Sequence, residues 1–231
     1  DVDKGGNAWV GTVLDGFYVI DMHNFSVNSI IDIPLLSGKT IRNGIHSIYC
    51  DKENNAVWIG LFNQGVCYYH PSMNKLTLCN KKLLRGAWGG EEIRCMLETF
   101  GGDILMGTAQ GLYRYDPKSH SMDILYKEFN QKNCRVLYED SKKRIWVGTY
   151  HDGLYCIEAG KVRAYAYPDT DYQNELDFSN IRAIIEDPSG RLWISIYGYG
   201  GVGQFNPETG EISLLLSLIH ISEPTRLQLI S

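Results

Sequence analysis

Four basic residues stand at the same position of four similar segments, and they are the side chains of this chain best suited to bind a ligand. They are His46, Arg94, Arg135 and Arg182, each the second residue of an expected β-strand. Arginine recognises planar or tetrahedral anions such as carboxylate and sulfate through paired hydrogen bonds. We therefore expect these residues to gather at one mouth of a central channel, where an acidic glycan is a natural candidate ligand.

A structural explanation of the same charges stays open. Three of the basic residues have an aspartate five residues downstream: Asp51, Asp140 and Asp187. Ion pairs between strands or neighbouring blades would neutralise the charges without any ligand. Arg94 departs from this pattern, because Thr99 stands at that offset with Glu98 beside it.

Aromatic residues offer a second kind of contact on the same face. Trp88 stands outside any repeat, flanked by small residues in the segment 85–92, and the face of an indole suits stacking on the C–H groups of a pyranose. Four further residues belong to expected connections between second and third strands: Tyr150, His151, Tyr197 and Tyr199. Each suits either ligand contact or a structural role at the end of a blade.

Catalytic and metal-binding chemistry has less support. General acid–base catalysis needs groups that converge, and no pairing of histidine with carboxylate recurs along the chain. The acidic segment 167–177 lacks the glycine and the terminal glutamate of an EF-hand calcium loop, so a solvated loop is favoured. We expect no catalytic residue, no metal and no cofactor.

The chain contains 6 cysteines, without a CxxC pair or a Cys/His cluster at metal-ligand spacing. Most are expected to be small buried side chains in strands. Cys95 and Cys134 fall in the first strands of neighbouring blades, one position apart in register. A disulfide between them stays open.

These residues are positioned by a unit that recurs five times. Each copy has a large lead residue, a glycine or serine two positions later, then a second glycine followed by apolar residues. The copies begin at Trp9, Trp58, Leu105, Trp146 and Trp193. Strand-rich repeats of about 40 to 50 residues are typical of β-propeller blades. The lead residues should fill the space between blades, and the glycines should admit close approach of backbones.

The repeat predicts an all-β fold, a β-propeller of four-stranded antiparallel blades over residues 1–215. The expected blades are 45–79, 92–126, 133–167 and 180–215, preceded by a partial blade at 1–31. Four blades and a partial one form an incomplete ring with two exposed edges. We therefore expect a piece of a longer gene product.

Bulk properties exclude other classes. The 231 residues carry a formal net charge of −5, which disfavours nonspecific binding of nucleic acid because that requires a basic surface. No run of 18 apolar residues and no signal-peptide pattern is present.

Three segments together resemble the two-component regulator propeller repeat: Arg135–Asp140 with the strand that follows it, Ile181–Trp193, and Gly111–Pro117. The resemblance covers about residues 1–215. It implies seven-bladed propellers, usually two in tandem, in the periplasmic sensor region of hybrid histidine kinases, which are inner-membrane proteins prominent in gut Bacteroidetes. Such receptors commonly sense glycans and control genes for their uptake and degradation.

The resemblance also implies the partners: an oligosaccharide or other small ligand, a second propeller, and a dimerising subunit of the full receptor. Kinase motifs are absent from this sequence, so enzyme activity and membrane attachment are expected only in other segments. A propeller lyase of the streptogramin-lyase type is the alternative, since such enzymes use a histidine and a magnesium-binding acidic residue on one face. A scaffold propeller of the WD40 kind lacks its Gly-His and Trp-Asp markers here.

The C-terminal segment differs from every repeat. Leu216–Arg226 resembles the translation of a sequencing-library adapter. We expect residues 216–231 to be a non-native tail, with a native apolar tail as the alternative.

Overall fold

The computed structural model describes residues 1–14, 16–30, 33–34, 40–41, 44–62, 65–70, 75–79, 85–86, 92–116, 121–165, 180–197 and 201–215. The expected tail at 216–231 and the acidic segment 167–177 both lie outside these residues. The described chain consists of β-strands joined by turns, with a short 3₁₀ helix at Lys127–Phe129. The prediction of an all-β fold is therefore confirmed.

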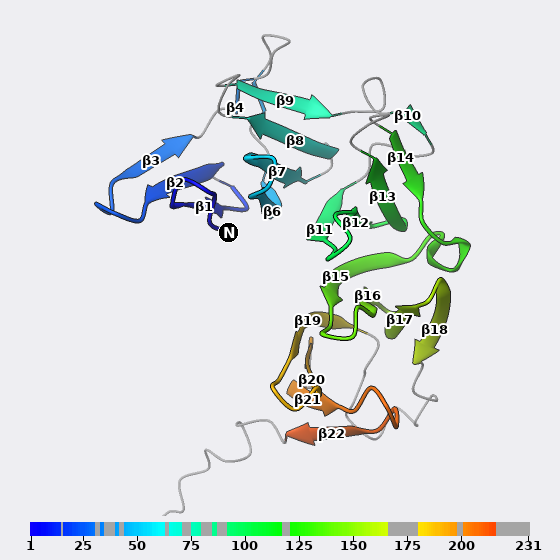
Figure 1. Ribbon diagram of the computed structural model, residues 1–231. Coiled ribbons are helices and arrows are strands. Elements are labelled where there is room, and N and C mark those ends of the chain that lie inside the picture. The colour runs from blue at the N-terminus through cyan, green and yellow to red at the C-terminus, as the bar shows by residue number, and fades with distance from the viewer. Residues whose placement is uncertain are drawn as a thin grey trace, which may run out of the picture.

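The strands form antiparallel meanders of propeller-blade type (Figure 1). The first sheet has three strands: β1 (Asn7–Gly11), β2 (Phe17–Asp21) and β3 (Val27–Ile30). The second has β6 (Ile45–Asp51), β7 (Ala56–Leu61), β8 (Gly65–His70) and β9 (Lys75–Cys79). The third has β11 (Ile93–Glu98), β12 (Ile104–Thr108), β13 (Leu112–Asp116) and β14 (Ser121–Ile124).

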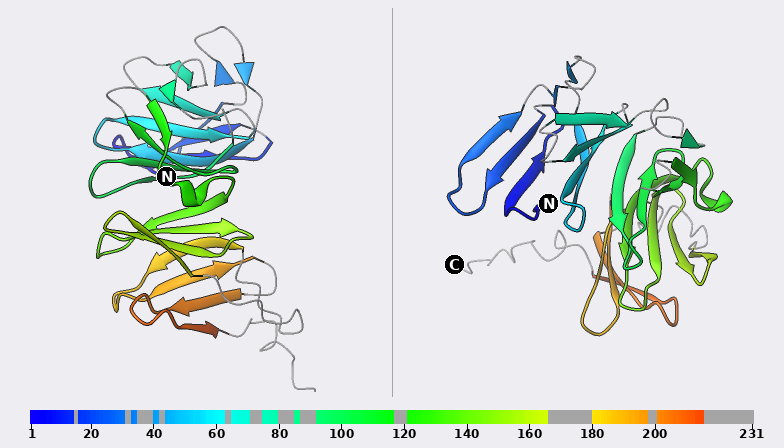
Figure 2. Two further views of the ribbon diagram at one scale, coloured as in Figure 1. Left: turned by 90° about the vertical axis from the view of Figure 1, so that its right-hand side faces the viewer. Right: turned by 45° about the horizontal axis from the view of Figure 1, so that its top comes forward.

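Two more four-stranded blades follow in the same order. One contains β15 (Asn133–Glu139), β16 (Ile145–Tyr150), β17 (Leu154–Glu158) and β18 (Lys161–Tyr165). The last contains β19 (Ile181–Glu186), β20 (Leu192–Ile196), β21 (Gly201–Phe205) and β22 (Ile212–Leu215). The first strands of successive blades contact one another and line the inside of an arc, which stays open between β1–β3 and β19–β22 (Figures 1 and 2).

Two small features go beyond four strands per blade. β10 (Arg85–Gly86) pairs in parallel with β14 and extends that sheet to five strands. β4 (Ile33–Pro34) and β5 (Thr40–Ile41) form a separate antiparallel pair. Both lie in crossovers between blades, where the repeat contains no pattern that would predict them.

The repeated glycine of the second strand sets the fit between blades. A Cβ built on Gly148 would lie 2.6 Å from the Cγ2 of Ile181, the first residue of the next blade's inner strand. At Gly60 it would lie 2.7 Å from the carbonyl oxygen of Ile93. These distances are shorter than any ordinary carbon contact, and the same Cβ atoms would lie 2.5 Å from Val136 and 2.3 Å from Ser47 of their own blades. Glycine is therefore required by crowding from both blades rather than by its own dihedral angles. This confirms the role expected of the glycines.

The indole N–H groups of three lead tryptophans are held by aspartates that lie earlier in the same blade. Trp9, Trp146 and Trp193 each donate an indole N–H to the aspartate six residues earlier, at 2.8, 2.8 and 3.0 Å: Asp3, Asp140 and Asp187. The ring of Trp146 then packs against Phe205 of the next blade, 5.5 Å between centroids. Trp9 packs in the same way against Tyr69 of its neighbouring blade, so both rings fill the space between sheets while their polar edges are fixed.

Two copies depart from this arrangement in a consistent way. Leu105 replaces the tryptophan, and Thr99 replaces the aspartate six residues before it. Asp51 precedes Trp58 by one residue more, and the Trp58 indole nitrogen is buried without a hydrogen-bond partner among the described residues. The aspartate and the indole therefore belong together as one structural unit.

Four of the cysteines described by the structure are free thiols: Cys50, Cys95, Cys134 and Cys156. The Cys95 sulfur lies 3.8 Å from the carbonyl oxygen of Cys134, within hydrogen-bond reach of the backbone. Burial raises the pKa of the Cys95 thiol to about 12. The disulfide left open by the sequence is therefore not formed.

Candidate functional site

The four predicted basic residues stand at four equivalent β-bulges. In each blade the pairing of the first two strands skips one residue near the start of the first strand, and the skipped residues are His46, Arg94, Arg135 and Arg182. A bulge re-aims its extra side chain and is often found beside binding sites. We call this row of residues the basic rim.

The first half of the basic rim, formed by His46 and Arg94, contacts one carboxylate. Glu92, of which only 7% of the side chain is exposed, accepts a hydrogen bond from Arg94 at 2.9 Å and contacts the imidazole Nε2 of His46 in the neighbouring blade. Burial lowers the pKa of the His46 imidazole, and the charges of Arg94 and Arg135 act in the same direction, whereas Glu92 opposes them. Glu92 therefore joins two blades and balances part of their charge.

In the second half of the basic rim, formed by Arg135 and Arg182, each guanidinium group lies over an aromatic ring. The guanidinium of Arg135 lies over Tyr150, 4.9 Å from the ring centroid, and that of Arg182 lies over Tyr197 at 4.6 Å. His46 stacks on Phe62 in the corresponding place, 5.2 Å between centroids. A cation held over an aromatic face keeps its charge and loses rotamer freedom. The structure thus brings Tyr150 and Tyr197 to the basic rim, as predicted.

A polar residue stands two positions before the bulged arginine in three blades. These residues are Glu92, Asn133 and Asn180. The side-chain carbonyl oxygens of Asn133 and Asn180 are buried and have no hydrogen-bond partner in the described part of the chain. Both asparagines pair with the backbone of Tyr150, which lies between them at the junction of the two last blades. An unpaired buried oxygen costs about 1–3 kcal/mol, so these two are positions where a ligand hydroxyl would be stabilising.

The aspartates suggested as ion-pair partners do not meet the basic rim. Asp140 and Asp187 lie at the far end of their strands, where they bind the tryptophan indoles and the backbone of the hairpin turn. Asp51 caps its own turn by accepting a hydrogen bond from the backbone N–H of Asn54 at 2.8 Å. The structural explanation was therefore wrong about these partners, although Glu92 supplies a charge partner of another kind.

Other predicted residues fall into two groups. His151 is exposed and has a positive φ of 81°, a backbone conformation that is uncommon for a residue with a side chain, and its ring lies 3.8 Å from that of Tyr150. Trp88 and Tyr199 lie outside the described residues. His151 is thus beside the basic rim, and the other two stay predictions.

Sequence reasoning missed four residues of this site: Phe62, Glu92, Asn133 and Asn180. A signal for the last three was present, since Glu92-Ile-Arg94, Asn133-Cys-Arg135 and Asn180-Ile-Arg182 share one pattern. A polar residue just before a strand resembles an ordinary turn residue, which concealed their common register.

A histidine and a carboxylate do converge at one place. The contact of His46 with Glu92 corrects the interpretation that no such pairing is forced together. Within the part of the chain that the structure describes, no group of three or more His, Cys, Asp or Glu side chains is arranged to hold a metal ion.

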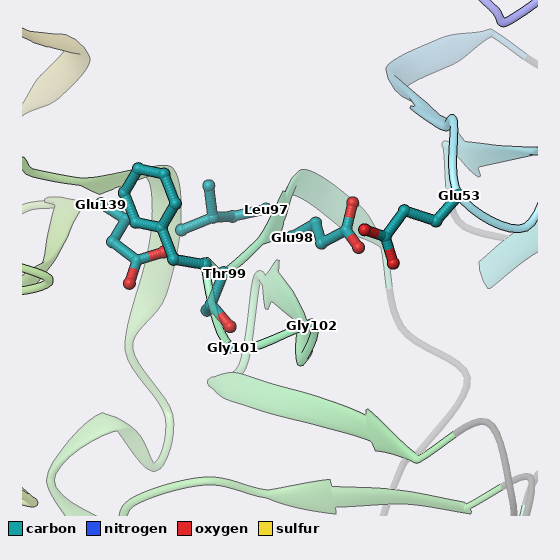
Figure 3. Close-up of a pocket in the computed structure, with 8 residues that line it drawn as sticks. Glu53, Leu97, Glu98, Thr99, Gly101, Gly102 and Glu139 are labelled. Atoms are coloured by element: carbon teal, nitrogen blue, oxygen red, sulfur yellow. The ribbon is translucent and has the colours of Figure 1, made fainter.

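The opposite ends of the inner strands are acidic. Glu98, Glu139 and Glu53 line a hollow of about 490 Å³ with Thr99 and the turn that follows it (Figure 3). Glu139 accepts a hydrogen bond from the backbone N–H of Phe100 at 2.6 Å, and Glu98 accepts one from the hydroxyl of Tyr49. These carboxylates are used to join blades, so the hollow is less suited than the basic rim to recognition.

No helix in the described residues is long and apolar enough to cross a membrane. The comparison with curated proteins finds no match. Among solved structures, the chain is similar to the extracellular domain of the putative hybrid two-component system BT4673 from B. thetaiotaomicron, with 21% identity and a TM-score of 0.67 over 86% of this chain. The alignment covers 26% of that structure, so the chain spans about a quarter of its length.

Two other structures share the fold. The chain is similar to PorZ, a surface component of the type-IX secretion system of Porphyromonas gingivalis, with 16% identity and a TM-score of 0.65 over 91% of this chain and 32% of that one. It is also similar to virginiamycin B lyase from Staphylococcus aureus, with 14% identity and a TM-score of 0.57 over 93% of this chain and 71% of that one. At these identities the likeness shows the propeller fold alone.

The sequence itself carries the family assignment. The model of the two-component regulator propeller matches residues 128–151 and 175–198. Both matches run through the end of the second strand of a blade, and they include Arg135 and Arg182 of the basic rim. These two segments therefore match the two-component regulator propeller repeat, the family that the sequence resembles.

Proposed function

We propose that this chain is part of the ligand-sensing propeller of a hybrid two-component sensor histidine kinase and that it binds an oligosaccharide in the periplasm. The observation that carries the proposal is the basic rim: four bulges in register, on repeats of the regulator propeller family, present cationic and aromatic side chains at one end of the inner strands. Binding, rather than catalysis, is what such a surface does.

The geometry suggests how binding would be transmitted. The inner strands of successive blades contact one another, and Tyr150 forms a backbone bridge to Asn180 across two blades. A ligand that contacts both blades favours one arrangement of them, and a receptor responds to the difference in affinity between its arrangements. In this proposal a second propeller, a dimerising subunit and the kinase lie in other parts of the receptor, and transcription of glycan-utilisation genes is the output.

Calorimetry of the purified chain with oligosaccharides tests the proposal. Neutral and acidic oligosaccharides of equal length are titrated into the wild type, into Arg135→Ala and into Arg163→Ala. Arg163 is the control because it lies on the outer strand β18 and is exposed. We expect binding of the acidic oligosaccharide to weaken at least tenfold in Arg135→Ala and to be unchanged in Arg163→Ala. Absence of heat with every saccharide contradicts the proposal.

One observation favours a second candidate, a propeller lyase. His46 and Glu92 converge, and burial keeps the pKa of His46 low, so the neutral imidazole has the form of a general base. The fold is shared with the lyase from S. aureus. Incubation with quinupristin and Mg²⁺, followed by chromatography, tests this candidate. Loss of the compound with the wild type but not with His46→Ala would establish the lyase and displace the sensor proposal.

A further inference from the structure

The charges of the basic rim are divided unequally between its two halves. Glu92 lies between His46 and Arg94 and compensates them. In the second half, Arg135 and Arg182 have no carboxylate partner among the described residues. Lys132, a nearby cation, is paired with Asp152 at 2.5 Å. Neither guanidinium group thus has a carboxylate within ion-pair distance in the described part of the chain, although the charge of Glu92 acts on Arg135 from farther away.

These two guanidinium groups also repel one another. Burial and the charges of Arg94 and Arg182 lower the pKa of the Arg135 guanidinium, which is still fully charged at neutral pH. The rings of Tyr150 and Tyr197 hold the two cations in place, so they cannot separate freely. An anion that lies between them would relieve this repulsion and satisfy donors such as the buried Nε of Arg135, which has no partner in the described chain.

The two asparagines indicate a second property of the ligand, which is that it carries hydrogen-bond donors. The carbonyl oxygens of the Asn133 and Asn180 side chains need a hydrogen-bond donor, and only 5% of Asn180 is exposed to water. A carboxylate has no donor to give, and neither has sulfate. A hydroxyl group does. A complementary ligand therefore presents acceptor oxygens to the arginines and hydroxyl donors to the asparagines.

We infer that the two last blades form the specificity site for an acid group of the ligand, an inference that rests on the proposed function. The ligand then belongs to the hydroxylated carboxylic acids of the uronic-acid class. Its carboxylate binds Arg135 and Arg182 while its ring hydroxyls donate to Asn133 and Asn180. His46 and Arg94 take no part in recognising the acid, because Glu92 already compensates them.

Three probes separate the requirements. They are the galacturonic acid trimer, which has carboxylates and hydroxyls; the galactose trimer, which has hydroxyls only; and tricarballylate, which has carboxylates only. Each is titrated calorimetrically into the wild type, Arg135→Gln, Arg182→Gln, Asn180→Leu and the outer-strand control Arg163→Gln. Circular dichroism melting establishes that every variant is folded.

We expect the galacturonic acid trimer to bind at least tenfold more tightly than either other probe. Arg135→Gln and Arg182→Gln should remove that preference and leave binding of the galactose trimer unchanged, and Asn180→Leu should weaken both saccharides. If the galactose trimer binds the wild type as tightly as the acidic trimer, the inference is overturned while the proposed sensor stands. If tricarballylate binds equally well, the hydroxyl requirement is overturned. If neither saccharide binds, the proposed function itself fails.

Discussion

The indole Nε1 of Trp146 donates a hydrogen bond to the carboxylate of Asp140 at 2.8 Å, across the hairpin that joins β15 to β16. The same carboxylate accepts from the Nε of Arg144 at 2.6 Å and from its backbone N–H at 2.9 Å. Asp140 is fully buried, so these donors replace the water it has lost. A polar residue thereby anchors the large apolar ring between two blades.

Trp146→Phe should destabilise the chain by about 2–4 kcal/mol, because it removes this hydrogen bond from a buried carboxylate and part of the ring's buried area. Trp58→Phe is the matched control, since the Trp58 indole is equally buried but its nitrogen has no partner among the described residues. We expect it to cost about 1 kcal/mol less than Trp146→Phe. Urea unfolding followed by circular dichroism measures both; equal losses would mean that the Asp140 contact contributes nothing.

Gly148→Ala should cost about 1–3 kcal/mol, because the added methyl group would lie 2.6 Å from Ile181 and would push the two last blades apart. Gly101→Ala serves for comparison, since a methyl group there lies no closer than 3.6 Å to Thr99. A surface change of that kind stays within about 0.5 kcal/mol. Thermal melting distinguishes the two, and a stable Gly148→Ala would show that the blades can separate without penalty.

The carboxyl group of Asp187 should titrate at an unusually low pH. The hydroxyl of Ser189, the backbone N–H of Arg191 and the indole of Trp193 all stabilise its charged form and lower its pKa to about 2. A pKa lower in the folded than in the unfolded state stabilises the protein above pH 4, and this contribution disappears as the pH falls toward 2. Carbon NMR of the aspartate side chains measures the titration. In Trp193→Phe the pKa should rise, and an unchanged value would contradict this account.

The described thiols should be unreactive in the native protein. Burial raises the pKa of Cys50 and of Cys156 to about 11, and that of Cys95 to about 12, so their thiolate fraction at pH 8 is about 0.1% or less. Iodoacetamide at pH 8, followed by peptide mass spectrometry, should leave these three unmodified until urea is added. Rapid labelling of Cys95 without urea would be inconsistent with the packing between β11 and β15.

The regular part of the fold could be predicted because each repeat contains the residues that determine its own strands. Trp146 and Gly148 mark a second strand that is buried on both faces, and the bulged Arg135 keeps its place in the preceding strand. The partner of Asp140 could not be predicted, since a five-residue offset from Arg135 suggested an ion pair. The strand between them is extended, which places the two charges at opposite ends.

The candidate site was predicted in part for a similar reason. Arg135, Arg182, Tyr150 and Tyr197 share a register within each blade, so their meeting followed from the repeat. The contact of Glu92 with His46 joins two different blades. Such a contact depends on how the blades pack in space, and the sequence of one blade contains no information about it.

The close approach at Gly148 has a consequence for how this scaffold diversifies. The fit between the two last blades depends on contacts at Gly148, which has no side chain and lies against Ile181, the residue next to the bulged Arg182 of the following blade. The bulged side chains can therefore be exchanged without changing the curvature of the arc. A triplet such as Asn180-Ile-Arg182 is therefore an exchangeable unit. Placing it at the equivalent position of another blade would transfer the binding specificity without a change in the propeller fold.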